Sequence, residues 1–287
     1  MMRAFTVQVG PVGFRVGSAW SGPVRALERL YADYPKPADD IPDFTVRLEP
    51  VSALRRWVRP SVAIRGDFML PDAVPTSLAH GLLAAEMAMN LQVAMGERRF
   101  LLLHASSVER DGKVLLMTGD SGSGKSTLSA LLGEKGWRFM GDEFALIEPE
   151  TGLAFPFPRP VSLKNEAVAE MLRHVAEGRL GPEMVGTPKG DIRHLKPPTE
   201  AIRRMGESGT PALLLFPRFG LARDVRPVPP SEVFVRLTQA STNYTMLGER
   251  GFEALANLVQ GIPARAIDYP DTATALALVD QLWAEHA

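Results

Sequence analysis

The chain has 287 residues, enough for one large domain or two modest ones, and its 45% hydrophobic and 23% charged residues are ordinary for a soluble globular protein. A balance of 32 Lys and Arg against 33 Asp and Glu leaves a formal net charge of −1, so no global field favours nucleic acid or an anionic membrane as partner. Without cysteine, and without an apolar run of about eighteen residues, the chain is expected to be a soluble cytoplasmic protein with neither disulfides nor a membrane segment.

The first 72 residues are expected to form a small mixed α/β region. Strands are predicted at 5–9, 12–16, 44–48 and 61–68, and a helix at 23–34. The first two strands flank Gly10-Pro11, which indicates a turn and hence an antiparallel hairpin. Residues 73–287 are expected to form a second, larger domain.

The longest periodic stretch covers residues 76–96 and predicts a buried helix rich in Ala and Met. Its Met-rich face is typical of core packing, with a ligand or partner groove as the weaker alternative. After an apolar run at 100–109, Asp111-Gly112 predicts a tight hairpin into a strand at 113–118.

That strand leads into a glycine-rich segment that fits the pattern G-x-x-x-x-G-K-[ST]. The segment reads Gly119-Asp120-Ser121-Gly122-Ser123-Gly124-Lys125-Ser126, and Thr127 follows. Such a loop turns successive backbone N–H groups into a hollow for phosphate, because residues without bulky side chains let phosphate oxygens approach the backbone. Lys125 would reach the outer phosphates, Ser126 would place its hydroxyl on Mg²⁺, and a helix beginning near Lys125 would direct its positive end at the anion. A Gly/Ser-rich turn that binds nothing is the alternative, and the order strand, loop, helix disfavours it.

Asp142 and Glu143 follow a strand predicted at 137–140 and stand 17 and 18 residues beyond Lys125. That spacing fits a helix and a return strand, which would bring both acids beside the loop. One carboxylate would hold Mg²⁺ and the other would accept the proton of an attacking hydroxyl, without the spacing deciding which does which. An exposed acidic turn is the alternative.

The remaining elements are predicted from periodicity. Strands are expected at 144–147 and 211–216, an extended segment at 155–161, and helices at 232–239, 252–259 and 273–283. Residues 186–198 are polar, glycine-rich and basic, which predicts a mobile substrate or lid loop. Its basic residues, and two others near residue 160, would either contact an anionic substrate or lie solvated at the surface. They are Lys189, Arg193, His194 and Lys196, together with Arg159 and Lys164.

Residues 104–147 resemble the catalytic core of the HPr kinase/phosphorylase family, most closely its branch called HPr-kinase-related kinase A. In that family a histidine precedes the strand, the loop reads Gly-Asp-Ser-Gly-x-Gly-Lys-Ser, and an acid pair follows the next strand. By itself His104, at the end of three leucines, is as well explained as a core histidine. The resemblance implies that it lies near the transferred phosphate.

The resemblance further implies an α/β fold with a P-loop kinase core of the HPr kinase and phosphoenolpyruvate carboxykinase type, a mixed sheet with flanking helices, over residues 73–287. Two departures stand out. The second acid is Glu143 where the bacterial enzymes have Asp, and Arg159-Pro160-Val161-Ser162-Leu163-Lys164-Asn165 replaces the family's Glu-Ile-Arg-Gly-Leu-Gly. The second departure leaves HPr as the acceptor, and the reverse phosphorolysis, open.

The sequence therefore predicts an ATP-dependent, Mg²⁺-requiring kinase that transfers the γ-phosphoryl group to a hydroxyl, in the first place a serine on a small protein or peptide. Its catalytic residues would be His104, Lys125, Asp142 and Glu143, with metal ligands drawn from Ser126 and the two acids. An ATP-gated regulatory binding module and a small-metabolite kinase are the alternatives. Family precedent implies a homo-oligomer.

Overall fold

The computed structural model describes residues 3–71 and 73–286 as a mixed α/β fold with several sheets and flanking helices. The chain folds into two compact units. The first unit comprises Met1–Glu97, Ser162–Leu172 and Ala176–Lys196, and the second comprises Arg98–Val161, Arg173–Val175 and Pro197–Ala287. The segments that form each unit are thus interleaved along the chain.

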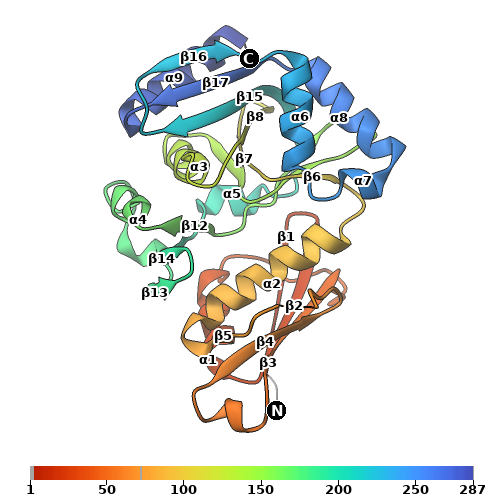
Figure 1. Cartoon of the computed structure of the whole chain (residues 1–287), viewed down its shortest axis with the longest axis vertical. Helices are drawn as coiled ribbons and strands as arrows, with labels where there is room; N and C mark the ends of the chain where they lie inside the picture. Colours follow the sequence, from red (N-terminus) through yellow and green to blue (C-terminus); the bar gives the residue numbers. More distant parts are fainter. Residues whose placement is uncertain (1–2, 72, 287) are drawn as a thin grey trace. The chain divides into compact units, whose positions relative to one another are not determined.

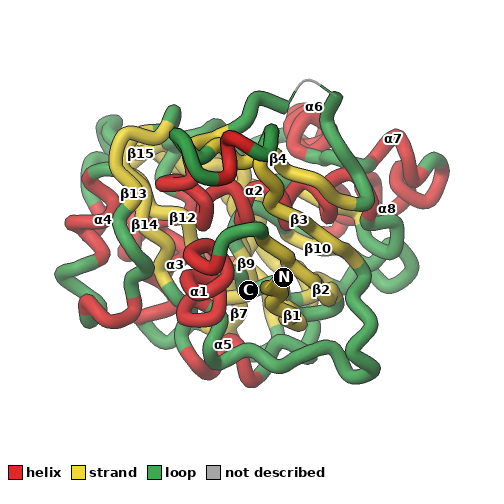
Figure 2. Tube along the Cα trace, turned by 90° about the horizontal axis from the view of Figure 1, so that it is seen from below, coloured by secondary structure: helices red, strands yellow, loops and turns green. Residues whose placement is uncertain are grey.

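The first unit is built on a five-stranded sheet. Its strands are β1 (Arg3–Val9), β2 (Val12–Ser18), β3 (Phe44–Pro50), β4 (Ser61–Gly66) and β5 (Thr76–Ser77), in the order β1-β2-β3-β4-β5. Figure 2 shows β1 to β4 side by side. Because β1 and β2 pair antiparallel with Val9 opposite Val12, the hairpin predicted around Gly10-Pro11 is confirmed.

Two helices, α1 (Ser21–Leu30) and α2 (Gly81–Gly96), pack on each other and on this sheet. The helix predicted from Thr76 begins later, because Thr76 and Ser77 pair with β4 and the Ser77 hydroxyl accepts a hydrogen bond from the Ala79 N–H at 3.3 Å. That bond caps the short 3₁₀ helix η2 (Leu78–His80); η1 (Leu54–Arg56) follows β3. Met89 is fully buried, which agrees with core packing of the Met-rich face.

A domain boundary at residues 72 and 73 stays a prediction, with Asp72 outside the described residues. The first compact unit extends further, to Glu97, because α2 packs against β3 and β4.

Composition predicts a mobile substrate or lid loop over residues 186–198, but most of this segment lies in two strands, so the loop is wrong there and its mobility stays a prediction. The elements in this part are β12 (Val161–Lys164), α4 (Glu166–Met171), η3 (Glu177–Arg179), β13 (Met184–Thr187) and β14 (Gly190–Leu195). β14 pairs with both β12 and β13, and the Thr187 hydroxyl donates to the Gly190 carbonyl at 2.6 Å across the turn. Gly190, directly after the turn at residues 188 and 189, has a φ of 90°. Gly186 has a φ of 68° where the pairing of β13 with β14 shifts register, so both glycines take left-handed conformations inside the hairpin.

The second unit contains a six-stranded sheet (Figure 1). In spatial order its strands are β16 (Asp224–Pro227), β17 (Ala264–Tyr269), β15 (Thr210–Phe219), β8 (Lys113–Thr118), β7 (Ala105–Arg110) and β9 (Arg138–Gly141). β8, β15 and β17 are parallel, and the outer pairs are antiparallel. Asp111 and Gly112 both have positive φ between β7 and β8, as a type I′ turn requires, so this predicted hairpin is confirmed.

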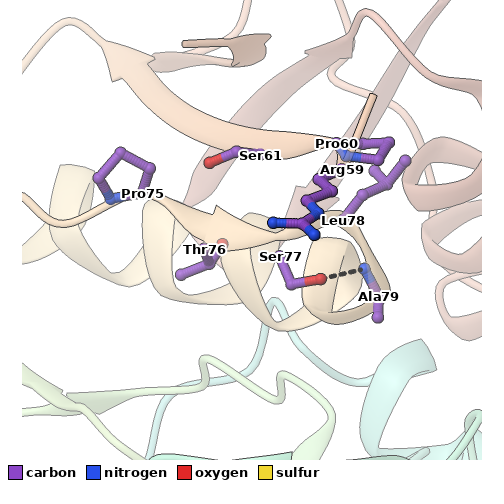
Figure 3. Close-up of a pocket in the computed structure, with 8 residues that line it drawn as sticks. All are labelled: Arg59, Pro60, Ser61, Pro75, Thr76, Ser77, Leu78 and Ala79. Carbon is purple, nitrogen blue, oxygen red and sulfur yellow. Dashed lines mark hydrogen bonds between the residues drawn. The ribbon is translucent and has the colours of Figure 1, made fainter. Parts of the chain in front are cut away.

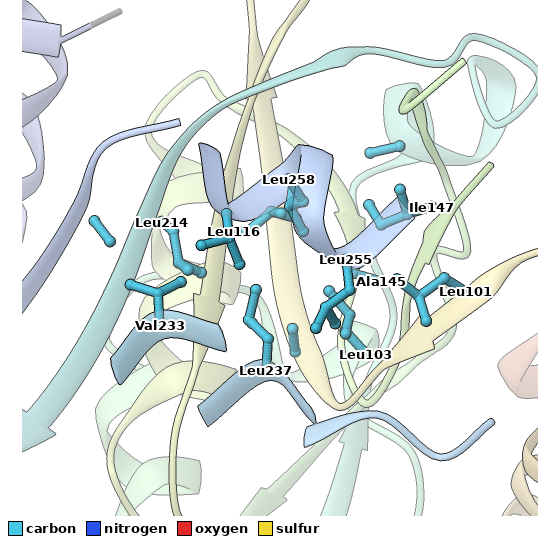
Figure 4. Close-up of a cluster of buried hydrophobic side chains, with 14 of the residues drawn as sticks. Leu101, Leu103, Leu116, Ala145, Ile147, Leu214, Val233, Leu237, Leu255 and Leu258 are labelled. Carbon is cyan, nitrogen blue, oxygen red and sulfur yellow. The ribbon is translucent and has the colours of Figure 1, made fainter. Parts of the chain in front are cut away.

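Helices cover both faces of this sheet. They are α3 (Lys125–Glu134), α6 (Pro230–Ala240), α8 (Glu249–Gly261) and α9 (Thr272–His286), and the smaller elements of the unit are β6 (Leu101–Leu103), β10 (Ala145–Ile147), β11 (Ala154–Phe155), α5 (Thr199–Arg203) and α7 (Tyr244–Leu247). On one face Leu116 and Leu214 pack with Leu237 of α6 and Leu255 of α8 (Figure 4). α3 and α9 pack on strands of the same sheet but contribute nothing to that cluster, so they cover the opposite face.

Periodicity predicted the helices near α6, α8 and α9 and the strand in β15, and all four are confirmed. It missed β17, because Arg265 and Asp268 interrupt the apolar residues of this short strand. Among the residues that the structure describes, no helix combines the length and the apolar character needed to cross a membrane.

Candidate functional site

Strand direction brings the predicted residues to one edge of the six-stranded sheet, which we call the carboxyl edge. β8, β15 and β17 are parallel and end there, and the glycine-rich loop (Gly119–Gly124) follows β8. β7 is antiparallel to β8 and begins at this edge, directly after His104. β9 is antiparallel to β7 and ends there, directly before Asp142 and Glu143. Segments far apart in the sequence thus meet at one edge.

The glycine-rich loop has the backbone geometry that its composition predicted. Gly119, Gly122 and Gly124 have φ of 150°, 86° and 95°, values that side-chain-bearing residues rarely adopt. A Cβ on Gly122 would meet nothing within 4 Å, whereas one on Gly124 would lie 2.4 Å from the Tyr269 hydroxyl oxygen. The loop is therefore open at Gly122 and packed against the end of β17 at Gly124.

Lys125 begins α3 and is buried, with only 7% of its surface exposed. Its ammonium donates to the carbonyl oxygens of Gly119 at 2.6 Å and Asp120 at 2.8 Å. A fixed cation therefore stands at the N-terminus of α3, where the helix dipole also favours an anion.

Asp142 lies beside the loop and faces two hydroxyl groups. Its Oδ1 accepts from Ser106 Oγ at 2.6 Å and from Ser126 Oγ at 3.0 Å. Ser106 comes from β7, Ser126 from the first turn of α3, and all three polar groups lie at the carboxyl edge. The pairing of Ser126 with Asp142 places the two predicted metal ligands within hydrogen-bonding distance of each other.

The other carboxylate oxygen of Asp142, Oδ2, is buried and has no hydrogen-bond partner among the described residues. Burial, and next the charge of Glu143, raise the pKa of Asp142 above its ordinary value. A buried carboxylate oxygen without a hydrogen-bond partner can coordinate a hard divalent cation. Mg²⁺ prefers one or two carboxylates together with phosphate oxygens. In the described part of the chain, no group of three or more His, Asp or Glu residues is placed to hold a metal alone. Asp142 Oδ2 and the Ser126 hydroxyl are the oxygen atoms here that could hold such a cation.

Glu143 differs from its neighbour in exposure and in backbone geometry. Its side chain is 38% exposed, and Oε2 lies 3.7 Å from Nδ1 of His104. Its φ is 66°, and the Phe144 N–H donates to the Asp142 carbonyl at 2.7 Å, so Glu143 is the centre of a strained γ-turn. Strain of this kind is concentrated at functional sites.

His104 lies where the chain passes from β6 to β7, between two different sheets. Its side chain is 45% exposed, so the alternative of a core histidine is wrong. Its backbone is held on both sides, since its N–H donates to the Ala240 carbonyl at 2.8 Å and its carbonyl accepts from the Thr118 hydroxyl at 2.9 Å. The imidazole thus faces solvent on a fixed backbone.

One of the basic residues considered as substrate contacts, Arg159, belongs to the second unit and follows Phe157, which forms a parallel bridge with Gly141 at the end of β9. Arg159 is buried, with its guanidinium over the Phe157 ring. The others belong to the first unit; they are Lys164, Lys189, Arg193, His194 and Lys196. In the first unit, Arg193 pairs with Glu177 at 2.7 Å and His194 is buried.

Three residues at the carboxyl edge escaped the sequence analysis. Ser106 bonds Asp142, the Phe219 N–H donates to the Ser123 carbonyl at 3.2 Å, and the Tyr269 hydroxyl donates to that carbonyl at 3.3 Å. Phe219 and Tyr269 end β15 and β17, strands that are parallel to β8, and such strand ends lie beside the glycine-rich loop. Only the order of the strands in the sheet, which the sequence does not show, identifies them.

A separate hollow of about 780 Å³ lies in the first unit (Figure 3). It is lined by Arg59, Pro60, Ser61, Pro75, Thr76, Ser77, Leu78 and Ala79. It is an open depression, and among the described residues that line it Arg59 has the only charged side chain and none is an acid. The side chains that could act as an acid, a base or a metal ligand are those at the carboxyl edge.

Neither a protein-family model nor a curated protein matches the chain. One solved structure with a distant likeness is the Hpr(Ser) kinase/phosphatase from Coxiella burnetii, at 16% identity and a TM-score of 0.29. The match covers 64% of this chain and 94% of that chain.

Proposed function

We propose that this chain is an ATP-dependent, Mg²⁺-requiring kinase that transfers the γ-phosphoryl group to a hydroxyl, a serine on a small protein or peptide. The observation that carries the proposal is the meeting of Ser126 and Asp142 beside the glycine-rich loop, with Asp142 Oδ2 buried and unpaired among the described residues. Positioning and charge neutralisation supply most of the catalysis in phosphoryl transfer, and this set of groups can provide both.

The two acids take different roles in this proposal because their surroundings differ. Asp142 is buried between Ser106 and Ser126, so it would hold Mg²⁺ together with Ser126. Bound Mg²⁺ would neutralise negative charge on the phosphates. Glu143 is accessible, so its carboxylate would accept the acceptor hydroxyl's proton while the acceptor oxygen bonds the γ-phosphorus and the bond to ADP breaks.

Lys125 and His104 complete the proposed site. Lys125 would exchange its bonds to the loop carbonyls for bonds to the outer phosphate oxygens. His104, 3.7 Å from Glu143, would orient that carboxylate and contact the transferred group. The loop's glycines would leave room for the phosphates.

The test is incubation of the full chain with γ-labelled ATP, Mg²⁺ and small proteins encoded beside its gene, followed by mapping of the modified residue. Lys125→Ala should abolish transfer, and Glu143→Gln should lower kcat by about 100- to 10,000-fold while ATP affinity stays within a few-fold. Lys135→Ala, an exposed lysine just after α3, is the matched control and should retain full activity. Unchanged transfer by Glu143→Gln would contradict the assignment of the base.

Two outcomes would favour the alternatives. Label that reaches small molecules but never protein indicates a metabolite kinase. Binding of a partner that needs ATP, and that a non-hydrolysable analogue supports equally, indicates a regulatory binding module. In a regulatory module ATP would order residues 186–198, most of which lie in the strands β13 and β14.

A further inference from the structure

Phe219 is an exposed aromatic residue in contact with the glycine-rich loop. It ends β15, the parallel neighbour of β8, and 53% of its surface is exposed. Its backbone N–H donates to the Ser123 carbonyl at 3.2 Å, and its Cβ lies 3.3 Å from the position of a Cβ on Gly124. The backbone and Cβ of Phe219 are therefore held against the loop, whereas its side chain is open to solvent.

Tyr269 supports this ring from the next strand. Tyr269 is 3% exposed, its ring centroid lies 6.0 Å from that of Phe219 at an interplanar angle of 56°, and its hydroxyl donates to the Ser123 carbonyl. The neighbouring guanidinium of Arg218 is held by two bonds to Asp268, at 2.8 and 2.6 Å. Arg218 and Arg226 hold the pKa of Asp268 at about 2, so the carboxylate stays ionised.

The strand order gives the direction in which a nucleotide would lie. The order β17-β15-β8-β7-β9 places the glycine-rich loop in the middle, the acids and His104 on the side of β7 and β9, and the aromatic pair on the side of β15 and β17. If the γ-phosphate lies toward Asp142, the rest of the nucleotide extends toward Phe219. The chain presents an aromatic face at that side.

We propose that Phe219, backed by Tyr269, forms the nucleobase subsite, in which the base of the bound nucleoside triphosphate stacks on the exposed face of Phe219. This inference rests on the proposed function and specifies how the same site takes its nucleotide. Stacking uses the π-face that every base has, so the subsite accepts adenine and guanine with affinities within about tenfold of each other. Gly124 lets the ring approach the loop closely.

The experiment measures binding of ATP, GTP and inorganic tripolyphosphate to the full chain by calorimetry in Mg²⁺. Wild type should bind ATP more tightly than tripolyphosphate. Phe219→Ala should weaken ATP by about 5- to 100-fold and leave tripolyphosphate within twofold, which also shows that the variant is folded. Phe219→Tyr should restore ATP affinity. Phe252→Ala, which removes an aromatic residue of similar exposure on α8, is the control and should change neither ligand.

The outcomes separate the subsite from the kinase proposal. Equal loss of ATP and tripolyphosphate in Phe219→Ala, or ATP affinity unchanged in that variant, overturns the subsite while the loop assignment stands. Failure of wild type to bind either ligand overturns both. A discrimination between ATP and GTP beyond about tenfold also contradicts stacking as the mode of recognition.

Discussion

Asp142 is a buried carboxylate in which only one of the two oxygens accepts hydrogen bonds. Ser106 and Ser126 both donate to Oδ1, whereas Oδ2 has no partner among the described residues. The raised pKa means that the folded chain keeps a proton that the unfolded chain releases near pH 3.8. Without a metal, stability should therefore fall as the pH rises from about 4 through the folded pKa of Asp142, by about 1.4 kcal/mol for each unit of elevation.

We expect Asp142→Asn to remove this pH dependence. Urea unfolding in EDTA should show the variant at least as stable as wild type near pH 7, with the advantage shrinking toward pH 4. Added Mg²⁺ and ATP should stabilise wild type strongly and the variant little beyond ATP alone. A variant that loses stability equally at all pH values would contradict the unpaired charge as the cause.

Ser106 is a positioning residue in this scheme, because it acts through Asp142. A hydrogen bond to a charged group contributes about 1.5–3 kcal/mol, so Ser106→Ala should lower kcat by about 10- to 100-fold. The Mg²⁺ concentration for half-maximal activity should rise, while KM for ATP changes little. Ser107→Ala, the next residue on the opposite face of β7, is the matched control. A change in both variants alike would indicate a general effect on packing.

At the scale of elements, the ends of β15 and β17 shape the glycine-rich loop. Gly124→Ala places a methyl 2.4 Å from the Tyr269 hydroxyl oxygen at a φ of 95°, and should cost about 2–4 kcal/mol of stability. Gly122→Ala has a similar φ but open space, and should cost only about 1 kcal/mol.

Tyr269→Phe should restore part of the stability lost in Gly124→Ala, because the next atom of the ring, Cζ, lies at 3.5 Å, an ordinary contact. A double-mutant cycle by urea unfolding measures this coupling. If the effects of the two substitutions on the free energy of unfolding are additive, the contact between the loop and the end of β17 does not contribute to stability.

At the scale of the whole molecule, the proposed site and the segment predicted to be a lid loop belong to different units. Every residue of the proposed site lies in the second unit, whereas the segment 186–196 belongs to the first. Hydrogen exchange without nucleotide should find slow amides in β14, since it pairs with β12 and β13. Added Mg²⁺ and ATP should protect the glycine-rich loop and the residues after β9, β15 and β17. Fast exchange throughout β14 would support the mobile loop after all.

Local patterns in the sequence were sufficient to predict the strand and helix around the glycine-rich loop, the β7–β8 hairpin and the periodic helices. Each of these features depends on residues that are close in the sequence. Asp111 and Gly112 take the positive φ that their tight turn requires, and the loop glycines take the positive φ that other residues rarely adopt. The sequence also supplied Asp142 and Glu143 as an acid pair, because their distance from Lys125 fits one helix and one strand.

The tertiary structure decided which acid is buried and which is accessible, and it brought Ser106 to Asp142 from 36 residues away and Tyr269 to Ser123 from 146 residues away. It also placed most of residues 186–198, where composition predicts a loop, in the hairpin of β13 and β14. These outcomes depend on strand order and direction. Burial and pairing between distant segments are properties of the whole packing, and no local pattern in the chain records them.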